Sequence, residues 1–129
     1  MQLLWGGLLL LLTMGAQAQL RAVVPNQTPA PASRVSSPAV DAGDYVYISG
    51  QGPRRSDGSF PANFSEQCRQ ALDNVRSVLE AAGLNLENVV YTQVYLEDIG
   101  HYEEVNRVFA GYFGKTPPAR AVLGVARVP

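Results

Sequence analysis

The sequence has few of the residues that build metal centres, disulfides and nucleophilic catalytic sites. Its 129 residues include one cysteine, Cys68, and one histidine, His101. A single thiol cannot form a disulfide within the chain, and it excludes a metal site built on several cysteines. The Gly50–Gly52 segment has neither the length nor the lysine of a phosphate-binding loop. The absences exclude zinc fingers, folds held by internal disulfides and P-loop nucleotide hydrolases.

The chain also lacks an excess of positive charge. Ten Lys and Arg residues against eleven Asp and Glu residues give a formal net charge of −1. A nearly neutral domain exerts no long-range attraction on a polyanion, so nucleic acid is not expected as its main partner.

The first eighteen residues have no charged side chain. Met1–Ala18 contains the run Leu8–Leu12 and ends in Ala16-Gln17-Ala18, with small residues where a signal peptidase cleaves. The run is too short to span a bilayer, which needs about 20 apolar residues. The segment therefore predicts a signal peptide cleaved after Ala18, with a periplasmic or secreted product that has no membrane attachment. An uncleaved anchor is the alternative.

The rest of the chain is the length of one domain. Residues 19–37 are rich in Pro, Ala, Ser and Thr without an apolar period, and predict a flexible leader. A folded domain is expected over 38–129. It should open with a hairpin turn over Val40–Tyr45, where Gly43 is free to adopt positive φ, and a strand over Tyr45–Ser49.

Two helices and two further strands follow. An apolar stripe predicts a helix capped by Asn63 and ended by Gly83. A strand over Val89–Leu96 precedes a second helix that begins at a cap on Asp98 and stops at Gly114, and a strand over Ala119–Val128 ends the chain. This order predicts an α/β (α+β) fold with two helices on one face of a mixed sheet.

The strand over Val89–Leu96 has two different faces. Val90, Thr92, Val94 and Leu96 form an apolar face, and the alternate residues form an amphipathic one. Tyr45, Tyr47, Tyr91 and Tyr95 lie on a sheet face that no helix of the chain covers. Tyrosine tolerates a partly wet environment, so this face suits a subunit interface, with solvent exposure as the alternative.

Arg120 is the side chain with the clearest chemical potential. It begins a strand directly after Pro117-Pro118-Ala119 and is followed by apolar residues. A guanidinium in such a place can bind a carboxylate with two parallel hydrogen bonds, and a structural salt bridge is the equal alternative.

His101 is expected at the surface and Cys68 in the core. Asp98 is read as a helix cap, and Glu97 and the pair Glu103–Glu104 as solvated.

The order of several short segments resembles a known family. They are Tyr45–Gln51, Gln67, Ala71–Val75, Ala81–Leu84, Val94–Asp98, Val105–Asn106, Phe113, Pro118–Arg120 and Val125–Pro129. From about Pro38 to its end the chain is similar to the RidA/YjgF family of reactive-intermediate imine deaminases, whose older name is the L-PSP endoribonuclease family.

The resemblance implies a chorismate-mutase-like fold and a homotrimer with ligand clefts between subunits. It implies hydrolysis of 2-imino acids such as 2-aminoacrylate to 2-oxo acids and ammonia, without a cofactor or metal. Arg120 matches the family arginine that binds the substrate carboxylate, and is the catalytic candidate. Asn106 and the pair Ser49–Gly50 match other substrate-binding positions of the cleft.

Three positions depart from the family pattern. Arg34–Ser36 stands where the family has Gly-Pro-Tyr, and Val122 stands where some members have cysteine. The sequence reaches Pro129 before the family's last strand, which bears a glutamate that orients water, so we expect Pro129 to be a truncation point.

The retained Arg120 favours an imine deaminase. The departures favour a module of the same fold that binds a small carboxylate or a protein without turnover. Ribonuclease activity ranks third, because no histidine pair or basic stripe supports it.

Overall fold

The computed structural model describes residues 19–25 and 35–128. The expected signal peptide, Met1–Ala18, lies outside the described residues, as does Pro129. Among the helices described, none is long and apolar enough to cross a membrane.

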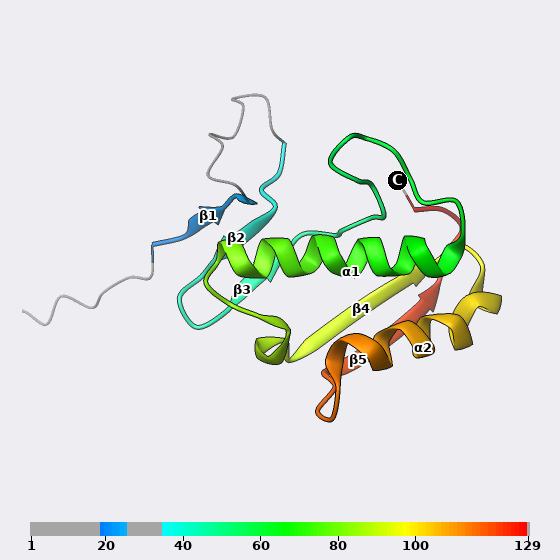
Figure 1. The fold of residues 1–129 in the computed structure, drawn as a ribbon. Helices are drawn as coiled ribbons and strands as arrows, with labels where there is room; N and C mark the ends of the chain where they lie inside the picture. The colour runs from blue at the N-terminus through cyan, green and yellow to red at the C-terminus, as the bar shows by residue number, and fades with distance from the viewer. Residues whose placement is uncertain (1–18, 26–34, 129) are drawn as a thin grey trace, which may run out of the picture.

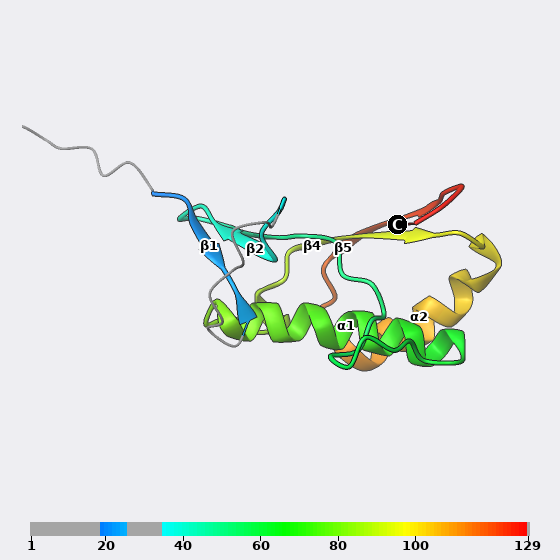
Figure 2. The same cartoon turned by 90° about the horizontal axis from the view of Figure 1, so that it is seen from above.

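The fold is α+β, with the helices in one layer and the strands in another (Figures 1 and 2). The elements, in chain order, are β1 Arg21–Val23, β2 Ala39–Asp41, β3 Val46–Ile48, α1 Phe64–Ala81, the 3-10 turn η2 Leu86–Asn88, β4 Tyr91–Leu96, the 3-10 turn η3 Ile99–His101, α2 Tyr102–Phe113 and β5 Ala119–Gly124. Both helices lie on the same face of the strand layer, which confirms the predicted arrangement.

The strands form two separate sheets within the described part of the chain, where one mixed sheet was expected. β1, β2 and β3 pair antiparallel in that order. β4 and β5 pair in parallel, with Thr92 opposite Arg120 and Val94 opposite Val122. Because α2 connects these two parallel strands, it packs back onto the inner face of their sheet.

Local sequence signals explain the limits of α1. The side chain of Asn63 accepts a hydrogen bond of 2.9 Å from the backbone N–H of Glu66, as the predicted cap requires. Gly83 has a φ of 75°, and the N–H of Leu84 donates to the carbonyl of Leu79 at 2.9 Å. This bond closes a Schellman-type end, which needs a left-handed residue where the glycine stands. The predicted start and end of the helix are confirmed.

Two apolar clusters form part of the core of the described residues. Val78 on α1 packs with Val23 and Ala39 beneath the three-stranded sheet. Leu72 on α1 packs with Val108 and Phe113 of α2. The two helices therefore share one cluster, which holds α2 at a set position above β5.

The start of the folded part differs from expectation. Residues 19–37 were predicted to be a flexible leader, but Arg21–Val23 forms β1 and pairs with β2. Val23 is buried, and Arg21 forms an ion pair of 3.1 Å with Asp41. A three-residue strand is too short to show an alternating pattern, so its tertiary partner was not visible in the sequence.

Two strand limits also differ. β4 begins at Tyr91, and Val90, predicted on the apolar face, precedes the strand and is exposed. β5 ends at Gly124, whereas a strand to Val128 was expected. The N–H of Val125 still donates to the carbonyl of Leu96 at 2.8 Å, but there β4 ends and the ladder has no further partner.

Candidate functional site

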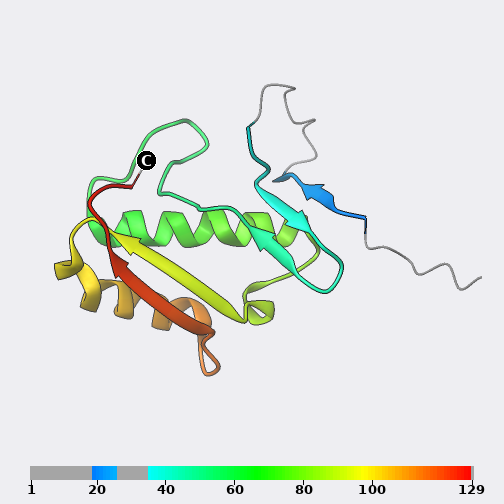
Figure 3. The ribbon, with the colours of Figure 1, turned by 180° about the vertical axis from the view of Figure 1, so that it is seen from behind.

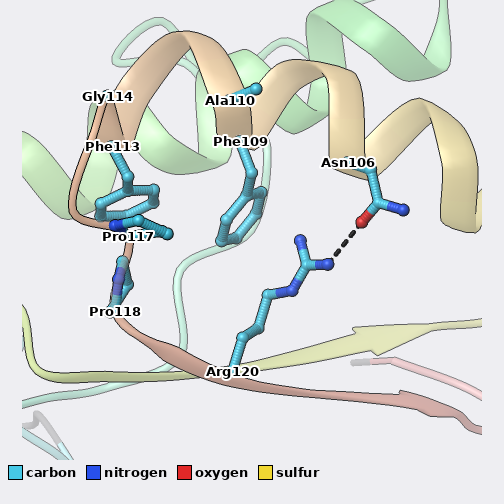
Figure 4. A pocket seen from close by; sticks show the side chains of 8 residues that line it. All are labelled: Asn106, Phe109, Ala110, Phe113, Gly114, Pro117, Pro118 and Arg120. Carbon is cyan, nitrogen blue, oxygen red and sulfur yellow. Dashed lines mark hydrogen bonds between the residues drawn. The ribbon is translucent and has the colours of Figure 1, made fainter.

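A pocket lies between α2 and the beginning of β5 (Figure 4). Its volume is about 340 Å³, enough for a small organic acid. Its lining residues are Asn106, Phe109, Ala110, Phe113, Gly114, Pro117, Pro118 and Arg120. The two phenylalanines are four residues apart on α2, so they share one side of the helix and form an apolar wall.

Arg120 carries the positive charge of this pocket. It extends from β5 toward α2, and its Nη2 donates a hydrogen bond to Oδ1 of Asn106 (Figure 4). The centre of its guanidinium lies 4.9 Å from the ring centroid of Phe109 and 5.8 Å from that of Tyr102. Contacts with aromatic faces hold the planar group in one orientation while leaving most of its N–H donors unused.

A structural salt bridge was the alternative role for Arg120. Among the described residues, the ion pairs are Arg21–Asp41, Arg76–Asp73 and His101–Glu104, and none includes Arg120. Arg120 is a half-buried cation without a carboxylate partner among the described residues, so it is suited to bind the carboxylate of a ligand.

Asn106 is oriented by a neighbour on its own helix. Its side-chain N–H group donates to Oε2 of Glu103 at 3.4 Å, which leaves Oδ1 to accept from Arg120. The structure therefore brings together two of the predicted site residues, Arg120 and Asn106, across 14 positions of sequence.

The other two predicted site residues lie elsewhere. Ser49 and Gly50 follow β3 and do not line the pocket. The hydroxyl of Ser49 donates to the carbonyl of Ser37 at 2.6 Å, and its backbone N–H donates to the carbonyl of Pro38 at 2.9 Å. Within one chain these bonds hold the end of β3 against the segment before β2.

A polar cluster that the sequence did not predict joins the beginnings of the two helices. The hydroxyl of Ser65 on α1 donates to Oε1 of Glu104, and Nδ1 of His101 lies 3.2 Å from Oε2 of the same carboxylate. The hydrogen bond from Ser65, and to a smaller degree that from His101, lowers the pKa of Glu104 below its usual range. The expectation that Glu104 is solvated is therefore wrong, because α1 and α2 converge there.

The single histidine and cysteine have structural contacts. The His101 ring stacks on Phe64 with ring centroids 3.9 Å apart and an interplanar angle of 8°, while its side chain remains 39% exposed. Cys68 is half-buried against the cluster shared by the helices, as predicted, and this burial raises the pKa of its thiol. Asp98 is a cap, as predicted, but of η3, where it accepts from the N–H of Gly100 at 2.8 Å. The second helix, which it was expected to cap, begins only at Tyr102 and has no side-chain cap.

The sequence analysis missed the walls of the pocket. Phe109, Phe113, Pro117 and Pro118 were not predicted as site residues, although the structure places them in the pocket lining. The spacing of Asn106, Phe109 and Phe113 at three and four residues was the available signal, because it places an amide and two rings on one side of α2.

The chain is similar to known proteins along most of its length. The sequence model of the family described as Endoribonuclease L-PSP matches residues 25–129. A RutC family protein of Pyrococcus horikoshii is 38% identical over 95 residues, which are 72% of this chain and 75% of that protein. The 2-iminobutanoate/2-iminopropanoate deaminase of Escherichia coli K12 is 39% identical over 94 residues, 70% of this chain and 73% of the relative.

Solved structures agree with the fold described above. The crystal structure of the YjgF gene product of E. coli has a TM-score of 0.76 and 34% identity, with 84% of this chain and 88% of that chain covered. The crystal structure of RidA from the Antarctic bacterium Psychrobacter sp. also has a TM-score of 0.76 and 34% identity, with 84% and 89% covered.

Proposed function

Because this chain belongs to the RidA/YjgF family, also described as the endoribonuclease L-PSP family, we propose that it hydrolyses small 2-imino acids to 2-oxo acids and ammonia. The observation that carries the proposal is Arg120, a half-buried cation at an apolar pocket with no carboxylate of the described chain as its partner. The similar E. coli protein is named for this class of substrate.

Arg120 binds the substrate carboxylate through two parallel N–H···O bonds. This contact fixes C2 of the imine beside the pocket wall. Water then adds to C2, its oxygen forms the new C–O bond, and its protons pass to the nitrogen. The C–N bond breaks, so that imine and water give one 2-oxo acid and one ammonia. The reaction exchanges no electrons with a cofactor and requires none.

An imine is already electrophilic, so the protein contributes mainly orientation and charge placement. Asn106 holds the guanidinium before substrate arrives, and Phe109 and Phe113 contact the short alkyl part of the substrate and keep bulk water from it. The positive charge of Arg120 repels a protonated amine at C2. The bound substrate carboxylate neutralises that charge, so the repulsion of the leaving group is smaller in the complex.

The test replaces Arg120 in the full-length protein. Arg120→Lys keeps the charge and loses the two-pronged geometry, so both Arg120→Lys and Arg120→Ala should hydrolyse 2-aminoacrylate, generated in situ, about 100-fold more slowly, equivalent to about 3 kcal/mol of transition-state binding. Far-UV circular dichroism controls for folding.

Equal rates for the wild type and Arg120→Ala would remove this residue from the mechanism. A wild type that binds a 2-oxo acid but does not accelerate hydrolysis would instead identify a binding module of the same fold.

We propose further that the active protein is a homotrimer with the site completed between subunits. Ser49 and Gly50 match family cleft positions but lie apart from the pocket in one chain. In this proposal a neighbouring subunit supplies them to the site of Arg120, and the exposed side chains of Tyr45, Tyr47, Tyr91 and Tyr95 offer a surface for that contact.

Export remains a proposal that rests on Met1–Ala18. The mature protein is expected to begin at Gln19, because Ala16 and Ala18 follow an apolar run too short to span a bilayer. Mass spectrometry of protein recovered outside the cytoplasm should give the mass of residues from Gln19 onward. A mass that includes Met1 would show that the segment is retained.

A further inference from the structure

One buried hydroxyl next to the pocket has no partner. Among the described residues, Oγ1 of Thr92 is the buried side-chain oxygen or nitrogen that makes no hydrogen bond. Thr92 is the second residue of β4 and lies directly opposite Arg120 in the parallel β4–β5 ladder. Neighbouring residues in register point to the same face of a sheet, so the hydroxyl and the arginine stem lie side by side on the face that α2 covers.

Nothing in the local fold requires this hydroxyl. Val94 and Val122 form the next pair on the same face, and valine has the shape and strand preference of threonine without its polar group. A buried hydroxyl without a partner costs the free energy of removing it from water, so valine would stabilise this position. A polar group kept at such a cost beside a site indicates a use in the site.

Arg120 is the group that can use it. A guanidinium has five N–H donors, and Asn106 is the acceptor recorded for it within the described residues. A threonine oxygen has two lone pairs. A bound substrate carboxylate occupies two N–H donors of the guanidinium. The Thr92 oxygen can then accept from one of the remaining N–H groups and so fix the orientation of the guanidinium plane.

We propose that Thr92 is a positioning residue, whose hydroxyl accepts a hydrogen bond from Arg120, directly or through one water, in the carboxylate-bound state. This inference rests on the proposed function, because it assigns Thr92 to the binding of the 2-imino acid by Arg120. The hydroxyl acts through the guanidinium and does not contact the reacting atoms.

The experiment compares two substitutions in the full chain. Thr92→Val removes the hydroxyl and keeps the shape, whereas Thr92→Ser keeps the hydroxyl. With Thr92→Val we expect the Kd for 2-oxobutanoate, measured by calorimetry, to rise about tenfold, and kcat/KM for 2-aminoacrylate to fall by a similar factor. Thr92→Ser should stay within about twofold of the wild type for both. The Tm of Thr92→Val should be unchanged or higher.

A double-mutant cycle separates positioning from general damage. In an Arg120→Lys background, Thr92→Val should lower kcat/KM by less than about twofold, because the geometry it supports is already lost. Ser77→Ala, which removes an exposed hydroxyl on α1, is the matched control and should change neither Kd nor Tm.

The failures of the two proposals are distinguishable. A wild type that neither hydrolyses 2-aminoacrylate nor binds 2-oxobutanoate overturns both. If the wild type is active, any of three results overturns the role of Thr92 alone. Thr92→Val has the activity of the wild type, Thr92→Ser is as impaired as Thr92→Val, or the losses of Thr92→Val and Arg120→Lys are additive. A Tm of Thr92→Val several degrees lower would show a structural partner for the hydroxyl and overturn the role too.

Discussion

The inner and outer faces of the β4–β5 sheet carry different kinds of side chain and have different contacts. On the inner face, Leu96 is 7% exposed beneath α2, and Arg120 is half-buried against the aromatic wall of the pocket. The outer face of this sheet is turned toward the viewer in Figure 3, with the helices behind it. Tyr91 and Tyr95 on this face are 55% and 51% exposed. Tyr95 and Leu96 are neighbours on β4 and point to opposite faces. Their exposure differs because the helices cover only one face of the sheet (Figure 2).

Tyr45 and Tyr47 extend the outer surface to the three-stranded sheet. They are 60% and 65% exposed, and their ring centroids are 6.5 Å apart. On the inner face, Arg120 forms no ion pair with a carboxylate of the described residues. On the outer face, the four tyrosines are each more than half exposed. We have proposed a substrate carboxylate as the partner of the first and a neighbouring subunit as the partner of the second.

The largest expected effect is on the outer face. Replacing Tyr91 and Tyr95 together with glutamate places two negative charges where the proposed trimer contact forms, and burying them without partners is unfavourable. We expect sedimentation to show monomers at micromolar concentration, with helix content retained. Ser77→Glu, on an exposed position of α1, should leave assembly intact. A wild type that already sediments as a monomer contradicts the proposed interface.

A second effect compares adjacent residues of β4. Leu96→Ala removes a buried side chain from the inner face and should lower the free energy of unfolding by about 3 kcal/mol, within the usual range of about 2–5 kcal/mol. Tyr95→Ala should cost clearly less in the monomeric state, because about half of that side chain is exposed. Urea denaturation of both variants at low protein concentration gives the comparison. Similar losses would mean that the outer face is covered within one chain.

The smallest effect concerns the cluster at the start of α2. The pKa of Glu104 is lowered in the folded state, mainly by the hydrogen bond from Ser65, so its contribution is present above the unfolded value of 4.5 and is lost as pH falls through the folded value. As the pH falls below 4.5, the stability of Glu104→Gln should therefore decrease less steeply than that of the wild type. Thermal unfolding between pH 6 and pH 3 measures it, with Glu80→Gln at an exposed position of α1 as the control. Parallel curves for Glu104→Gln and the wild type would contradict this role.

Sequence reasoning was accurate where the signal was local. The Asn63 cap, the end of α1 at Gly83 and the exposed side of β4 follow from residues within a few positions of each other. Carboxylate binding by Arg120 was predicted from its place at the start of a strand and from the family resemblance, and the structure adds its contacts with Asn106 and Phe109. The strand at Arg21–Val23 was missed because only its pairing with β2 defines it.

The sequence by itself determined the two amphipathic helices, both limits of α1, the end of α2 and the alternation along β4, because backbone propensity, capping and side-chain period act over a few residues. Only the tertiary structure decided which charges share an environment. Asn106 meets Arg120 across 14 positions, and Ser65 meets Glu104 across 39. Such pairs depend on how α1 and α2 pack on the sheet, and no local pattern specifies which side chains that packing brings together.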